Sequence, residues 1–328
     1  MFGVSQDRVT GQDEFQFRSG VELINVTATV TDQSGRFVPG LMLTDFLVYE
    51  DDQPVEISHF SSERVPVSLG IVLDTSGSMA GEKMTTARAA IERFLDQLLN
   101  PDDEVFLYGF ASGARLLRDW TTNRAAVSAS LWGVYASGGT AMFDAVAEAV
   151  PKADGGRHRK KAIVLISDGD DTNSRAGISE VRAAVRETEV LVYAIGIDGA
   201  DRRRVRPQRP TSPPRRIPFP IPGRRRAGQP WSVFPQFPPT LGGFGGGGRI
   251  NVTALRAITD DSGGRTEVVR SVRDLTPATA SIADELSRQY YLGYTSPGHR
   301  DGRWHTIRVE ARDSSFRVRA RRGYIAAS

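Results

Sequence analysis

The sequence predicts an α/β fold: a doubly wound, mostly parallel sheet with a small β-sandwich-like module. Two observations predict this class. In the middle of the chain, continuously apolar runs such as VSLGIVLD alternate with stretches whose apolar residues recur at helical spacing. That alternation is typical of parallel strands covered by helices on both faces. Near both ends of the chain, apolar residues alternate with polar ones, which indicates half-buried strands of antiparallel sheets.

The N-terminal segment opens the predicted β module. Residues 1–19 are polar, and we expect them to be a flexible tail. From Val26 to Val30 apolar residues alternate with threonines, which predicts a strand. Two further short strands are expected around the turn-forming stretch Asp51-Asp52-Gln53-Pro54. Residues 20–62 therefore form an N-terminal β segment.

The predicted α/β domain spans residues 66–289 and alternates strands with helices. Its strands are expected at VSLGIVLD, EVFLYGF, ARLLRDWT, KKAIVLISDG, EVLVYAIGI and RTEVV. Its helices are expected at residues 84–98, 140–153, 178–188, 251–264 and 274–289. Because each buried strand is followed by a helix or a turn, the strands are expected to lie side by side in one sheet.

The C-terminal segment returns to strict alternation. Three strands are expected within residues 290–325, at 290–294, 307–311 and 316–320. We expect this segment to pack with residues 20–62, so that the α/β domain interrupts one β module. The first strand of the α/β domain starts, and its last helix ends, at the edge opposite to the carboxyl ends of the strands. The β module should therefore lie at that opposite pole.

Composition limits the classes of function. The chain has 328 residues, a formal net charge of +3 and no cysteine, which excludes disulfides, thiolate metal sites and cysteine nucleophiles. No apolar run reaches the roughly 18 residues of a membrane span. The stretch 200–249 holds eleven arginines and one acidic residue, Asp201, so the rest of the chain is acidic.

Oxygen-bearing side chains gather where the predicted parallel strands end. Asp74 ends one strand and is followed by Ser76 and Ser78; Asp168 ends another, and Thr140 lies in a glycine-bearing loop before a helix. Ligands of parallel α/β sheets bind outside the carboxyl ends of the strands. Carboxylate and hydroxyl oxygens without histidine or sulfur suit a hard cation: Mg²⁺ first, with Mn²⁺ and Ca²⁺ as alternatives. Taken singly, Ser78 and Thr140 are more typical of helix caps and Asp168 of a turn.

The motifs Asp74-x-Ser76-x-Ser78, Gly139-Thr140 and Ser167-Asp168-Gly169 resemble the metal-ion-dependent adhesion site of von Willebrand factor type A domains. Their order and spacing also match, and the resemblance covers about Pro66 to Gln289. The flanking segments resemble a bacterial family of von Willebrand A-related proteins, which implies an architecture more than an activity.

The resemblance implies roles for the five residues. Ser76, Ser78 and Thr140 would bind the cation directly, and Asp74 and Asp168 would act largely through coordinated water. A cation held mainly by neutral hydroxyls keeps much of its charge, and would therefore capture an Asp or Glu side chain of a protein partner. Two further acidic neighbours, Asp170 and Asp171, would offset that charge if they faced the cation; we expect them to be solvated loop charges.

The Arg/Pro/Gly-rich insert at 200–249 has a composition that cannot form a packed core. A disordered spacer, a flap over the metal face and an arm that binds nucleic acid or another anionic surface are the three interpretations. The arginines of the anionic-partner arm are Arg202, Arg203, Arg204, Arg224, Arg225 and Arg226.

The sequence favours an adhesion or assembly module over an enzyme. None of the four histidines accompanies a nucleophilic serine in a recognisable elbow, and no phosphate-binding glycine loop opens a helix. The sequence as given begins without a signal peptide. Because related proteins with flanking β modules are often exported, the resemblance nevertheless implies an extracytoplasmic location.

Overall fold

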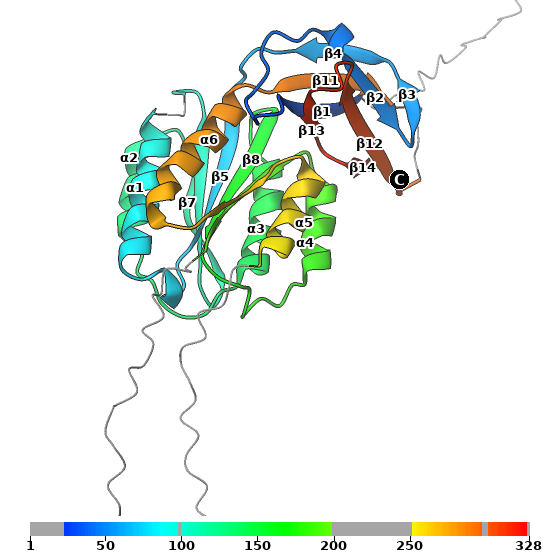
Figure 1. Ribbon diagram of the computed structural model, residues 1–328. Helices are drawn as coiled ribbons and strands as arrows, with labels where there is room; N and C mark the ends of the chain where they lie inside the picture. Colours follow the sequence, from blue (N-terminus) through cyan, green and yellow to red (C-terminus); the bar gives the residue numbers. More distant parts are fainter. Residues whose placement is uncertain (1–22, 98–99, 199–250, 297–300, 327–328) are drawn as a thin grey trace, which may run out of the picture.

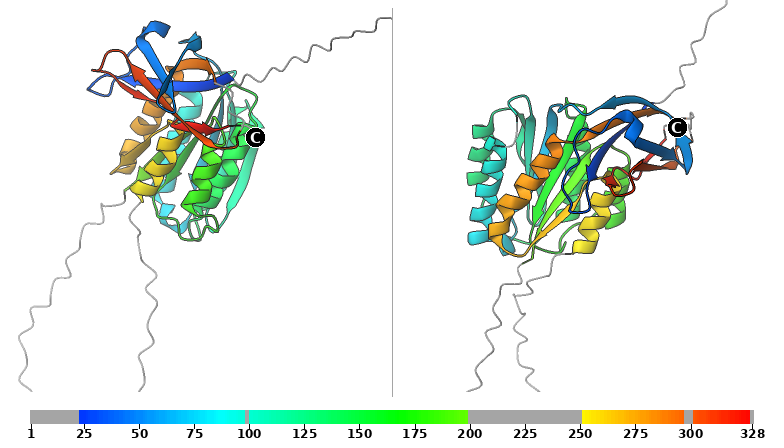
Figure 2. Two further views of the ribbon diagram at one scale, coloured as in Figure 1. Left: turned by 90° about the vertical axis from the view of Figure 1, so that its right-hand side faces the viewer. Right: turned by 45° about the horizontal axis from the view of Figure 1, so that its top comes forward.

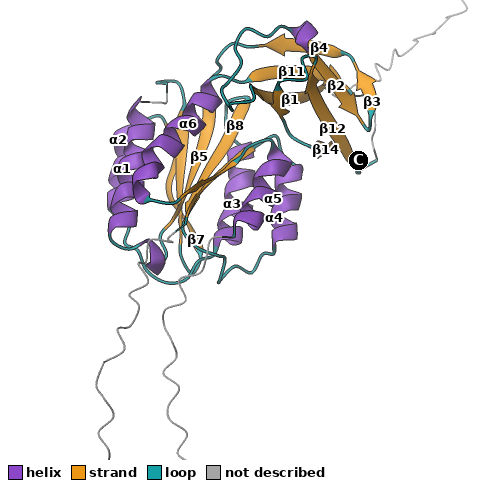
Figure 3. Cartoon of the chain, viewed as in Figure 1, coloured by secondary structure: helices purple, strands orange, loops and turns teal. Residues whose placement is uncertain are grey.

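The computed structural model describes residues 23–97, 100–198, 251–296 and 301–326. The expected tail at 1–19 and the Arg-rich insert at 200–249 lie outside these residues. The described chain consists of an α/β domain and, at one end of it, a group of antiparallel strands (Figures 1 and 3).

A six-stranded sheet forms the centre of the α/β domain, in the order β10-β9-β8-β5-β6-β7. Neighbouring strands are parallel except for β6 and β7, which are antiparallel. The strands are β5 (Val67–Asp74), β6 (Glu104–Phe110), β7 (Ala114–Thr121), β8 (Lys160–Ser167), β9 (Leu191–Ile197) and β10 (Thr266–Val269). Every residue of β5, β6 and β9 is buried, as their continuous apolar runs require. The predicted α/β fold class is confirmed.

Helices cover both faces of this sheet (Figure 1). One face packs against α1 (Glu82–Gln97), α2 (Arg124–Trp132) and α6 (Leu275–Ser287), with the short helices η2 (Gly77–Met79) and η3 (Val272–Asp274) beside them. The other face packs against α3 (Met142–Asp154), α4 (Ile178–Arg186) and α5 (Val252–Ser262). Helix α2 was not predicted, although its start carries a signal: the side chain of Asn123 accepts a hydrogen bond from the amide of Ala126, at 3.1 Å.

The β module consists of two four-stranded antiparallel sheets, in the orders β13-β1-β11-β4 and β14-β12-β2-β3. Each sheet combines strands from both ends of the chain, which pack over a shared apolar core. The N-terminal elements are β1 (Leu23–Thr31), η1 (Leu43–Asp45), β2 (Phe46–Glu50), β3 (Gln53–Val55) and β4 (Ile57–Ser61). The C-terminal strands are β11 (Tyr290–Thr295), β12 (Trp304–Ala311), β13 (Arg317–Arg319) and β14 (Gly323–Ile325). The predicted β module of N- and C-terminal segments is therefore present.

Two details of the module differ from the prediction. Three strands, not two, lie around residues 51–54, because the chain leaves one sheet after β3 and enters the other as β4. Asp51 and Asp52 form the two-residue turn between β2 and β3, with φ angles of 47° and 62°. Positive φ at both central residues is typical of a type I′ turn, whose backbone twist matches the twist of the flanking strands. Strand β14 was not predicted, because its three residues are too few to show a periodic pattern.

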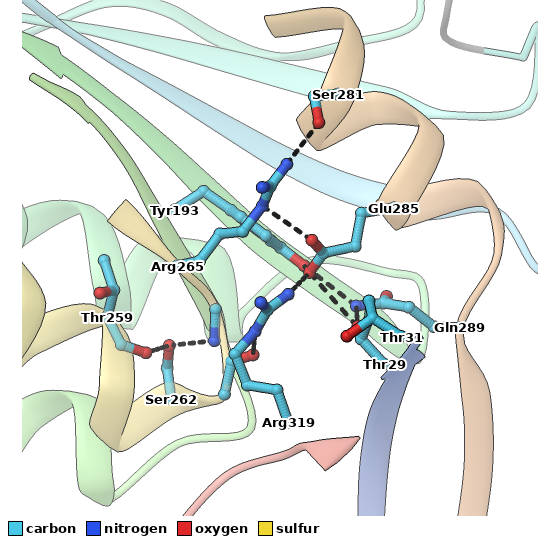
Figure 4. Close-up of polar contacts among 12 residues, drawn as sticks. Thr29, Thr31, Tyr193, Thr259, Ser262, Arg265, Ser281, Glu285, Gln289 and Arg319 are labelled. Carbon is cyan, nitrogen blue, oxygen red and sulfur yellow. Dashed lines mark hydrogen bonds and ion pairs between the residues drawn. The ribbon is translucent and has the colours of Figure 1, made fainter. Parts of the chain in front are cut away.

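The module lies at the amino ends of the parallel strands, at the pole opposite to their carboxyl ends (Figures 1 and 2). A buried polar group joins the two parts at that pole, and we call it the Glu285 cluster; it comprises Thr29, Tyr193, Arg265, Glu285, Gln289 and Arg319 (Figure 4).

Glu285, on α6, is the centre of this cluster and is 8% exposed. Its Oε1 accepts hydrogen bonds from Tyr193 of the α/β sheet at 2.9 Å and from Thr29 of the module at 3.3 Å. Its carboxylate also forms ion pairs with Arg265, at 2.9 Å, and with Arg319 of β13. The carboxylate is thus compensated by two cations and two hydroxyls, which come from both parts of the chain.

Candidate metal centre

The candidate centre begins where β5 ends. Asp74 is completely buried, and both of its carboxylate oxygens accept hydrogen bonds. The amide of Ser76 donates to Oδ1 at 2.8 Å, and the hydroxyl of Ser167, at the end of the neighbouring strand β8, donates to Oδ2 at 2.6 Å. Burial raises the pKa of Asp74, and the nearby charge of Asp168 adds to the rise.

A chain of hydroxyls connects this loop to Asp168. The Oγ atoms of Ser76 and Ser78 are 2.9 Å apart, and Ser78 Oγ donates to Asp168 Oδ1 at 2.7 Å. The other oxygen of Asp168 pairs with the ammonium of Lys83, on the first turn of α1. The Asp168 side chain is only 1% exposed, so Lys83 provides the one positive charge that compensates it among the described residues.

Thr140 approaches from a third loop. A β-carbon at Gly169 would lie 3.7 Å from Thr140 Oγ1 and 4.0 Å from Ser78 Oγ, so the two hydroxyls line the same small space. Backbone hydrogen bonds hold the three loops together. The amide of Gly77 donates to the carbonyl of Gly138 at 3.0 Å. The amide of Thr172 donates to the carbonyl of Thr140 at 2.8 Å.

The two additional acidic residues have different surroundings. Asp171 accepts hydrogen bonds from the amide of Phe143, at the start of α3, and from the amide and hydroxyl of Ser174. Its carboxylate thereby caps α3 and closes its own loop. Asp170 is partly buried, and its Oδ1 has no hydrogen-bond partner within the described part of the chain. The six arginines of the expected arm lie outside the described residues.

The structure gives contacts to residues for which the sequence predicted no role. Ser167 orients Asp74, and Lys83 pairs with Asp168. Tyr135 is 86% exposed and lies in the loop between α2 and α3, near the backbone that contacts Gly77. Ser167 belongs to a recognised motif and Lys83 directly precedes a predicted helix, but their contacts depend on the packing of strands and loops.

The donor set is rich in hydroxyls and poor in carboxylates. Within the described ranges, no group of three or more His, Cys, Asp and Glu side chains is arranged to hold a metal ion. Asp74, Ser76, Ser78, Thr140 and Asp168 instead supply two carboxylates and three hydroxyls at one edge of the sheet. Oxygen donors of this kind are the ligands that Mg²⁺ and Ca²⁺ prefer.

Comparison with known proteins identifies the domain. Residues 69–209 match the sequence profile of the von Willebrand factor type A domain. The chain therefore contains a von Willebrand factor type A domain. Domains of this family commonly mediate protein–protein interaction or adhesion, and they often bind a divalent cation.

Two curated relatives match parts of the chain. An uncharacterized protein of Synechocystis sp. is 31% identical over 111 residues, which is 33% of this chain and 26% of that protein. Inter-alpha-trypsin inhibitor heavy chain H4 of Homo sapiens is 32% identical over 139 residues, or 37% of this chain and 15% of that protein. The chain thus spans about a quarter or less of the length of these relatives.

One solved structure shares the fold at low identity. Proximal thread matrix protein 1 from the mussel byssus has a TM-score of 0.50 and 14% identity, covering 72% of this chain and 50% of that one. A von Willebrand factor type A protein from Catenulispora acidiphila covers 95% of this chain and 75% of its own, with 15% identity and a TM-score of 0.48.

Among the helices described, none has the length and apolar character needed to cross a membrane.

Proposed function

We propose that the chain is a divalent-metal-dependent protein-binding module that captures an acidic side chain of its partner at the carboxyl edge of the sheet. The single observation that carries this proposal is the linked set of hydroxyls and carboxylates that runs from Asp74 through Ser76 and Ser78 to Asp168. Thr140 lines the same space.

The donor set fits a hard cation. Two carboxylates lie close enough for the charge of Asp168 to raise the pKa of Asp74, and both are withdrawn from water. Lys83 is the cation that pairs with Asp168. A buried, negatively charged pair with limited compensation favours the binding of an additional cation. Asp74, Ser76, Ser78, Thr140 and Asp168 would hold it, and Mg²⁺ is the ion we expect.

The bound cation would supply a positive charge that its ligands only partly neutralise. The chain's own contribution is to fix these ligands. Ser167 and the amide of Ser76 orient Asp74, and the backbone contacts of Gly77 and Thr140 hold the loops in register. Such prior positioning lowers the entropy cost of binding a partner's carboxylate.

A binding role also agrees with the positions of the described histidines. His305 contacts Asp51 and Asp301 in the β module, and His158 contacts the carbonyl of Asp102. His59 is an exposed residue of β4. None of these three is available as a general base at the candidate centre, so we propose a binding role and no enzymatic one. The extracytoplasmic location and the anionic-partner function of the insert remain predictions.

The function can be tested with two immobilised pentapeptide libraries, one with a central Asp and one with a central Asn. We expect the protein to bind the Asp library in Mg²⁺, and to lose this binding in chelator or in the Ser76→Ala variant. Ser179→Ala, which alters an exposed serine on α4, serves as the matched control. Equal binding to both libraries, or binding that survives the chelator, would contradict the proposal.

A further inference from the structure

A cleft of about 650 Å³ opens directly beside the candidate metal centre. Ser78 and Lys83, which belong to the centre, form one of its walls. Asp198, which directly follows β9, and Arg270 and Arg273, which follow β10, also line the cleft. The cleft and the centre are therefore continuous at the carboxyl edge of the sheet.

The parallel pairing of β9 and β10 brings together the lining residues that follow these two strands. Val269, the last residue of β10, is paired with Ile197, the last residue of β9. The amide of Asp198 donates to the carbonyl of Val269 at 2.8 Å, which keeps the two strand ends together. Arg270 and Arg273 follow this fixed point within four residues, and both are exposed.

Two arginines of the cleft are available to an anion. The charged residues of the lining are Lys83, Arg270 and Arg273 and the acidic Glu82 and Asp198. Because Lys83 already pairs with Asp168, the positive charge offered to a ligand comes from Arg270 and Arg273. Within the described residues, neither Arg270 nor Arg273 has a side-chain hydrogen bond or an ion pair. By contrast, Arg265, which directly precedes β10, pairs with both Glu267 and Glu285. The two guanidinium groups at the cleft therefore keep their donors available for a ligand.

We propose that this cleft binds a second carboxylate, carried by the same partner segment whose first acidic side chain occupies the metal centre; the inference rests on the proposed function. The partner is then a protein segment with two acidic residues a few positions apart. Arg270 and Arg273 receive the second carboxylate, since guanidinium forks match carboxylate geometry. Glu82 and Asp198 disfavour a continuous polyanion such as nucleic acid, because its further charges would lie against them.

The test uses pentapeptide libraries with a central Asp, with and without a second Asp or Glu. In Mg²⁺, we expect the wild-type protein to bind peptides with two acidic residues about tenfold more tightly than those with one. The double variant Arg270→Gln/Arg273→Gln should lose this preference and retain metal-dependent binding of one-acid peptides. Arg256→Gln, an exposed arginine on α5, is the matched control. An unchanged preference in the double variant would overturn the proposal.

A second arm separates this proposal from the metal-dependent function. In chelator at low salt, a labelled pentapeptide with two acidic residues should bind several-fold more weakly to the double variant than to the wild type or to Arg256→Gln. The arginines of residues 200–249 are the same in all three proteins, so their contribution cancels. Equal affinities of the three proteins for this peptide would contradict the proposal that the cleft binds a carboxylate, even if the metal site is correct. If a labelled oligothymidine bound more tightly than this pentapeptide, and the double variant weakened its binding, the proposal of an acidic protein segment would be wrong and nucleic acid would be the ligand of the cleft.

Discussion

At the amino pole of the sheet, the carboxylate of Glu285 is surrounded by two arginines and two hydroxyl donors. At the carboxyl edge, Asp74 and Asp168 are buried at least as deeply as Glu285, but they have less positive charge around them. Hydroxyl and amide groups donate hydrogen bonds to them, and Lys83 provides a single ammonium. Buried carboxylates thus occur in two settings. The carboxylate of Glu285 is compensated by contacts from two parts of the chain, whereas Asp74 and Asp168 are only partly compensated, and in the function that we propose they receive an additional cation.

The largest effect is expected at the compensated pole. Glu285→Ala should lower the free energy of unfolding by about 3–5 kcal/mol, because Arg319 and Tyr193 lose a buried partner. Urea denaturation measures the loss. Asp284→Ala is the control: Asp284 forms an exposed pair with Arg288, and its removal should change stability by less than about 0.5 kcal/mol. Equal effects of the two substitutions would contradict the role of the Glu285 cluster.

The second effect concerns the close backbone approach at the same pole. Gly263, after α5, has a φ of 85°, and a β-carbon there would lie 2.6 Å from the backbone atoms Ala320 C and Arg321 N. Gly263→Ala should therefore cost about 3 kcal/mol, from strain and overpacking together. Gly40→Ala shares the positive φ but meets open space, and should cost about 1 kcal/mol. Thermal unfolding of both variants compares them; a Gly263 variant as stable as the Gly40 variant would contradict the packing of α5 against the module.

The third effect is a pH dependence at the amino pole. Lys160 is 3% exposed, and burial lowers its pKa to about 7, with Arg64 adding to the decrease. Between about pH 7 and 10.5 the unfolded chain holds a proton that the folded chain has lost, so the stability of the folded state rises with pH. From pH 7 to 9 the wild type should gain about 2 kcal/mol relative to Lys160→Met, as measured by urea denaturation. A constant difference between the two proteins would show that Lys160 keeps its proton.

The smallest effect is expected at the carboxyl edge. Lys83→Met should tighten the binding of Mg²⁺ by about tenfold, or about 1.4 kcal/mol, because the ammonium no longer competes for Asp168. Calorimetric titration measures this change. Lys161→Met is the control, since Lys161 pairs with Asp154 at the other end of the sheet. Weaker binding in the Lys83 variant would mean that Lys83 supports the centre instead of competing with it.

The sequence predicted those features whose signals are local. Continuous apolar runs identified β5, β6 and β9, since strands buried on both faces need no polar side chains. The position of Asp74 and Asp168 was also predictable, because parallel strands bring the two residues to one edge of the sheet whatever the details of packing.

Features that depend on contacts between distant segments could not be predicted. Glu285 meets Thr29, 256 positions away, and nothing in the sequence of α6 indicates this partner. The cleft is lined by Ser78, from the start of the α/β domain's sequence, and by Arg270 and Arg273, from near its end. Short elements such as β14 have too few residues for a periodic pattern, and their partners determine them.

The most direct test of the central claim is a calorimetric titration of Mg²⁺ into metal-free protein, with Mn²⁺ and Ca²⁺ in parallel. The account predicts one cation per chain for the wild type and for Ser179→Ala, and no binding for Ser76→Ala and Asp168→Asn. If the wild type binds no divalent cation, or if both site variants bind it as tightly as the wild type, the metal centre proposed at this edge of the sheet is wrong.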